Sequence, residues 1–208
     1  DYQIFKYYQN YHKDKLNDFI QKIATEVRSG EKTIKHIEFL KDLFDASEEN
    51  KEIAVYENVL LFFRLYFSRL LSKKDLAKDK QQKQIKKLLH KIENSLAELL
   101  NPSADINSDL HTEICNFFIF YDSNIYNYIC ESQIDSNLSR FYDIIDKLIS
   151  KIIYLPEHKK PEINTYIKFK FGLNIYQDNR MQSEIYFRAA STQNYLKAMY
   201  FLSEVVKH

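Results

Sequence analysis

The chain has 208 residues, of which only 2 are glycine and 3 are proline. This scarcity of turn-forming residues disfavours a β-sheet protein built from tight hairpins. Its 30 basic and 29 acidic residues give a net charge of +1, so no overall field indicates a nucleic-acid or membrane partner.

The N-terminal half contains apolar residues at the three-to-four-residue spacing of amphipathic helices. These runs cover residues 16–27, 34–44, 53–71 and 85–99. The third run is apolar on almost every side, which is typical of a helix in the middle of a fold. The segments expected to end the first, second and fourth helices are Ser29-Gly30, Asp45-Ala46-Ser47 and Asn101-Pro102-Ser103.

The C-terminal half continues the same pattern after a long aromatic segment. Its expected helices cover residues 110–129, 141–153, 163–176, 185–190 and 196–206. Nine or ten helices joined by short loops make consecutive helices antiparallel neighbours. No linker is long enough to divide the chain, so the sequence predicts one all-α domain over residues 1–208.

Targeting signals and disulfide patterns are not apparent. No stretch approaches the roughly 18 apolar residues of a membrane span, and no signal peptide is recognisable. Cys115 and Cys130 form no CxxC pair, which is typical of a reducing compartment. We therefore expect a cytoplasmic location. Because the first residue is Asp1 rather than Met, we expect the chain to be a piece of a longer protein.

Motifs of catalysis are also not apparent. The six histidines are scattered, and His90 with Glu93 alone does not make a closed metal site. There is no glycine-rich phosphate loop, no GxSxG elbow and no HExxH motif. We expect no enzyme, no metal and no cofactor.

Residues 73–91 form a basic segment that could bind phosphates. Apolar residues in the same segment mark a stripe that faces a core, which favours the interpretation as the solvated face of an amphipathic helix. No aromatic residues are interleaved in it, as binding of single-stranded nucleic acid would favour.

Polar residues interrupt several apolar helices. An asparagine amide both donates and accepts hydrogen bonds, so an asparagine in a groove can bind the backbone of an extended peptide. A bond to a neighbouring helix or to water is the alternative. The candidate peptide-binding residues are Asn58, Arg64, Asn116, Tyr121, Asn127, Tyr128 and Asn174.

Arg64 is the most informative candidate, because a charge inside the run Phe62-Phe63-Arg64-Leu65-Tyr66 is costly unless it is paired. One interpretation is a clamp for the C-terminal carboxylate or an acidic side chain of a peptide. The other is a structural ion pair, for example with Asp122, or extension of the side chain to solvent.

The segment Lys168–Ala190 is similar to a tetratricopeptide-like repeat. Gly172 stands where two helices approach each other, and Ala189, Ala190 and Ala198 have the spacing of close-packing positions. The similarity implies a right-handed stack of antiparallel helix hairpins.

A second segment, Phe118-Ile-Phe-Tyr-Asp122 followed by Ile125-Tyr126, resembles the aromatic and acidic middle segment of Rgg-type regulators of Gram-positive bacteria. The spacing from Asp122 to the Gly172 helix resembles that of the related ComR-type regulators. Phe118 stands where Rgg proteins often carry Trp, and Asp122 stands in place of Glu.

The resemblance to these peptide-pheromone-binding regulators implies a function. Their plan is a DNA-binding helix-turn-helix followed by a helical repeat domain that binds a short peptide. It implies transcription regulation and quorum sensing, with the DNA-binding domain expected upstream of residue 1, because residues 1–70 show no helix-turn-helix.

The last helix predicts self-association. Its apolar residues surround nearly the whole helix, so the face without a neighbour meets solvent or a partner. We expect a homodimer through the C-terminal helices, which contain Met199, Tyr200, Phe201, Leu202, Val205 and Val206. Two alternatives to the regulator stay open: a secreted or surface all-α adhesin, and a helical scaffold without a small ligand.

Overall fold

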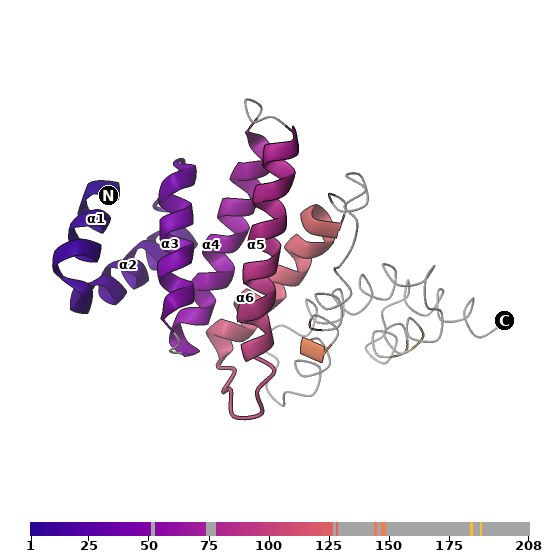
Figure 1. The fold of residues 1–208 in the computed structure, drawn as a ribbon. Helices are drawn as coiled ribbons and strands as arrows, with labels where there is room; N and C mark the ends of the chain where they lie inside the picture. Colours follow the sequence, from indigo (N-terminus) through magenta and orange to yellow (C-terminus); the bar gives the residue numbers. More distant parts are fainter. Residues whose placement is uncertain are drawn as a thin grey trace. The chain divides into compact units, whose positions relative to one another are not determined.

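In the computed structural model the described residues are 1–50, 53–73, 78–126 and six single positions between 128 and 188 (Figure 1). The chain divides into two compact units, Asp1–Glu113 and Ile114–His208. The prediction of one domain stays a prediction.

Every secondary-structure element of the described residues is helical, and no strand occurs among them. The elements are α1 (Tyr2–Tyr11), η1 (Lys13–Lys15), α2 (Leu16–Arg28), α3 (Ile37–Glu49), α4 (Ile53–Ser72), α5 (Lys78–Glu98), α6 (Ser108–Phe120) and the π-helical η2 (Tyr121–Tyr126). The all-α prediction is confirmed for this part of the chain.

Helix α4 lies between its neighbours, as its apolar composition predicts. It packs against α3, α5 and α2, and Figure 1 shows α3, α4 and α5 side by side. Phe62, Phe63 and Phe67 are fully buried on α4. The Phe63 ring lies 6.0 Å from that of Phe44 on α3 and 5.7 Å from that of Phe67, so aromatic packing holds this layer together.

The first two helices form a pair at the N-terminal end. Phe5, the buried residue of α1, lies with its ring 6.0 Å from Phe19 of α2 and 5.7 Å from Phe39 of α3. Helix α2 ends at Arg28, and Gly30 adopts a φ of +79°, which is the left-handed conformation that glycine takes after a helix. The predicted helix end is confirmed.

One local prediction needs correction, and one helix was not predicted. Helix α3 begins at Ile37 and continues to Glu49, through the segment expected to end it. Ala46 and Ser47 are buried, and the Ser47 hydroxyl donates to the Leu43 carbonyl at 2.8 Å, so a polar residue is accommodated inside the helix. Helix α1 was not predicted, because Phe5 alone of its residues is buried and a core-facing stripe is missing.

Among the described residues, no helix is both long enough and apolar enough to span a bilayer. Helix α4 has the length, with 20 residues, but Glu57, Arg64 and Arg69 interrupt it. Glu57, Arg64 and Arg69 are half-buried.

Candidate ligand-binding site

Five polar residues from three helices gather into one group within the first unit. Arg28 ends α2, Glu57, Asn58 and Arg64 lie on α4, and Glu113 lies on α6. We call this group the two-arginine cluster. Glu57 and Arg64 are seven residues apart and so share a face of α4.

A single carboxylate, that of Glu113, holds both arginines. Its Oε1 accepts a hydrogen bond from Arg28 Nε at 3.0 Å, and its Oε2 accepts one from Arg64 Nη2 at 2.6 Å. Arg28 Nη2 also donates to Asn58 Oδ1 at 3.1 Å and lies 3.9 Å from Glu57 Oε2. Charge-assisted bonds of this kind are among the strongest that side chains form.

Burial differs across the cluster. The Glu113 side chain is 6% exposed, whereas those of Arg64 and Arg28 are 21% and 30% exposed. Both arginine side chains are therefore partly exposed, while the carboxylate between them is covered. Among the described residues, buried Asn58 Nδ2 and Arg64 Nε have no hydrogen-bond acceptor. Two buried donors of the cluster are thus unsatisfied, which is costly.

Glu57 lies at the edge of the cluster, next to the start of α6. Burial raises the pKa of its carboxyl, although the Arg28 guanidinium and a hydrogen bond from Asn107 partly oppose this effect. Asn107 Oδ1 accepts from the backbone N–H groups of Asp109 and Leu110 at 3.0 and 2.8 Å, which caps the helix. The Asn107 side chain therefore both caps the N-terminus of α6 and contacts the cluster through Glu57.

The predicted site residues divide between the two units. Asn58 and Arg64 come together in the cluster, linked through Arg28 and Glu113. Asn116 is half-buried on α6, Tyr121 is buried in η2, and Tyr128 is half-buried, all within the second unit.

Two predicted site residues, Asn127 and Asn174, lie outside the described residues, as does the C-terminal dimerisation segment. The statement that the seven residues line one groove remains a prediction.

Arg64 forms an ion pair, as one of the two interpretations expects. Its partner is Glu113. The Asp122 side chain, named as a possible partner, lies outside the described part of the chain. Arg28 and Glu113 were missed by the sequence analysis. An acid inside the apolar run from Leu110 to Phe120 was the available signal for Glu113.

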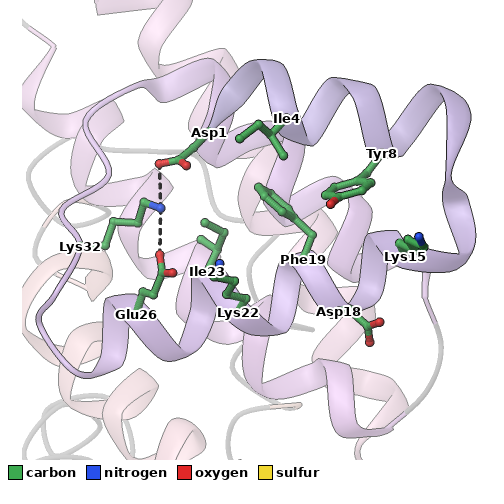
Figure 2. A pocket seen from close by; sticks show the side chains of 10 residues that line it. All are labelled: Asp1, Ile4, Tyr8, Lys15, Asp18, Phe19, Lys22, Ile23, Glu26 and Lys32. Atoms are coloured by element: carbon green, nitrogen blue, oxygen red, sulfur yellow. Dashed lines mark hydrogen bonds and ion pairs between the residues drawn. The ribbon is translucent and has the colours of Figure 1, made fainter.

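A separate pocket of about 440 Å³ lies between α1 and α2. Figure 2 shows Ile4, Tyr8, Phe19 and Ile23 along its middle, next to Lys22, with further charged side chains at both ends. At one end Lys32 Nζ bridges Asp1 Oδ2 at 2.7 Å and Glu26 Oε2 at 2.8 Å.

The charged rim of this pocket has both signs, and this mixture selects no ligand class. It is lined by Asp1, Ile4, Tyr8, Lys15, Asp18, Phe19, Lys22, Ile23, Glu26 and Lys32. Within the described ranges, no three His, Cys, Asp or Glu side chains gather as a metal site would need.

Comparison of the chain with protein-family models, with curated proteins and with solved structures gives no match. The resemblance to the peptide-pheromone-binding regulators therefore rests on the two sequence segments quoted above.

Proposed function

We propose that this chain is the ligand-sensing domain of a cytoplasmic transcription regulator and binds a short peptide. The observation that supports the proposal most is the two-arginine cluster. Two arginine side chains from different helices donate to one carboxylate, and both side chains are partly exposed. A peptide's terminal carboxylate or acidic side chain has the same chemistry as the group they already hold.

The position of the cluster is consistent with a groove. It joins α2, α4 and α6, which are alternate helices of the chain. In a stack of antiparallel helix hairpins, alternate helices line one face, and the curvature of such stacks creates a concave binding surface. We propose that the hairpins stack in a right-handed, tetratricopeptide-like superhelix with the cluster on its concave face.

An extended peptide would need partners for its backbone as well as for its carboxylate. Asparagine side chains supply both a donor and an acceptor, and Asn58 has a donor to spare among the described residues. Peptide binding would shift an equilibrium between two states that differ in affinity for the peptide. The proposed homodimer would carry that shift to DNA bound by another domain of the protein.

The experiment is a titration of the chain with fluorescein-labelled short peptides that have free C-terminal carboxylates, followed by anisotropy. Arg64→Met keeps the bulk of the side chain but removes its charge. Arg69→Met on the same helix is the matched control, since Arg69 forms no ion pair with a described residue. Circular dichroism checks that both variants are folded.

We expect Arg64→Met to weaken binding of the best peptide at least about tenfold, as the loss of a charge-assisted bond would. Arg69→Met should bind like the parent. If no peptide in a diverse library binds the parent chain, the proposed function is wrong. If both variants bind equally well, a peptide site exists but excludes Arg64.

A further inference from the structure

Charge is distributed unevenly along this nearly neutral chain. Residues 73–91 carry eight lysines and two aspartates, while the whole chain has a net charge of +1. The remainder of the chain is therefore net acidic. Segregation of this kind produces a local positive potential that the net charge conceals.

The structure places four of these lysines on the solvent-facing side of α5. Ile85, Leu88, Leu89 and Ile92 are buried against the rest of the first unit. The opposite side carries Lys80, Lys83, Lys86 and Lys87, all exposed, and we call these four residues the basic face. Since α5 rises about 1.5 Å per residue, the basic face extends over roughly 10 Å.

The basic face differs from the other end of the same helix. Lys91 pairs with Asp45 at 2.6 Å and with Glu48 at 3.1 Å. None of the four lysines of the basic face forms an ion pair with a described residue. Asp79 is the one acid among residues 78–87. Lys91 therefore has a structural role, because it pairs with acids of α3, whereas the lysines of the basic face have no such role among the described residues.

The chemistry of the face limits the kind of partner. Lysine is a flexible point charge, which suits contacts to phosphates, and such contacts carry no sequence information. The apolar side of α5 is committed to the core, so this helix has no apolar side with which to enter a bilayer. None of residues 78–90 is aromatic, so stacking on unpaired bases is not supported. A row of closely spaced phosphates fits best.

We propose that the basic face of α5 binds the phosphate backbone of double-stranded nucleic acid without sequence preference. This inference is independent of the proposed peptide site, because the two surfaces use different residues. The ligand is a polyanion of high linear charge density, and the lysines act by releasing its condensed counterions.

The test uses the full chain and a labelled duplex of arbitrary sequence, with anisotropy measured over a range of salt concentrations. The variant is the triple substitution Lys80→Gln, Lys83→Gln and Lys87→Gln. The control is Lys13→Gln, Lys15→Gln and Lys35→Gln, which removes the same charge at three other exposed positions without a described ion pair. Circular dichroism confirms that both variants are folded.

We expect the parent to bind the duplex at low salt. The slope of the logarithm of the binding constant against the logarithm of the salt concentration should be smaller in magnitude by about 2 to 3 in the basic-face variant. The control should keep the slope of the parent. Absence of binding by the parent at low salt overturns the proposal, as does an equal loss in the control. Vesicles of phosphatidylcholine and phosphatidylserine that compete better than duplex, at equal anionic charge, would assign the face to membranes instead.

Discussion

Helices α4 and α5 have 20 and 21 residues and pack against each other, but their charged residues obey different rules. On α4 the Arg64 guanidinium forms an ion pair with Glu113 of α6, at 2.6 Å. On α5 the lysines of the basic face extend into solvent without a described partner. The difference shows that surroundings decide whether a charge needs a counter-charge: a side chain covered on most sides does, and a hydrated one does not.

The largest effect on stability is expected when a buried side chain of α4 is truncated. Phe63 is fully buried and contacts the rings of Phe44 and Phe67. Phe63→Ala should lower the free energy of unfolding by about 3–5 kcal/mol, because the lost ring leaves a cavity. Urea denaturation followed by circular dichroism measures the loss. A decrease below about 1 kcal/mol would mean that α4 is not a core helix.

The next largest effect is expected at the two-arginine cluster. Glu113→Gln keeps the shape of the side chain but leaves Arg28 and Arg64 without their shared counter-charge. Unfolding should become easier by about 2 kcal/mol, less than for a fully buried pair because both arginines are partly exposed. The control is Glu31→Gln at an exposed position.

A double-mutant cycle with Arg64→Met separates the pair from its surroundings. If Glu113 and Arg64 stabilise each other, the double variant should lose less stability than the two single losses combined. Strictly additive losses would show that the contact contributes nothing, even though the distance is short.

A smaller effect is expected for the paired lysine of α5. Burial by itself lowers the pKa of Lys91, but hydrogen bonds to Asp45 and Glu48 outweigh burial and raise that pKa above 10.5. Burial by itself raises the pKa of Asp45, but the hydrogen bonds from Lys41 and Lys91 outweigh burial and lower that pKa below 3.8. Lys91→Met should cost about 0.5–1 kcal/mol at neutral pH.

The pH dependence of the Lys91→Met loss follows from these directions. The Lys91 contribution is fully present below pH 10.5 and is lost as the pH rises through its raised folded-state pKa. The Asp45 contribution is present above pH 3.8 and is lost as the pH falls through its lowered pKa. Denaturation at several pH values should therefore show parent and variant converging at both extremes. A constant difference would exclude the ion pairs as its cause.

The smallest effect is expected at the basic face. Lys83→Met removes a hydrated charge that has no described ion pair, so the free energy of unfolding should change by less than about 0.5 kcal/mol. A loss as large as that of Lys91→Met would show that the lysine has a structural partner.

The helices whose predicted limits agree with the structure have strong local signals. The apolar run of α4 predicts residues 53–71, and the helix covers Ile53–Ser72. Helix α2 ends before Gly30, as its capping residue predicts. Helices α1 and α3 show the limit of such signals. Phe5 of α1 is buried against Phe39 of α3, a contact that the local sequence does not indicate, and Ser47 continues α3 by a hydrogen bond to the Leu43 carbonyl of its own helix.

The candidate site was only half predictable for the same reason. Asn58 and Arg64 stand out as polar residues in an apolar run. Arg28 ends an ordinary amphipathic helix, and basic residues are common at that position without any tertiary partner. Nothing in its local sequence indicates a bond to Glu113, 85 residues away.

The sequence alone determined that this protein is helical where it is described, because the spacing of apolar residues and the shortage of glycine and proline act locally. It also determined where charge is concentrated along the chain. The tertiary structure alone decided which acid neutralises Arg64, a partner 49 residues away. Local periodicity specifies the buried side of a helix, but only the packing of α2, α4 and α6 brings two arginines to one carboxylate.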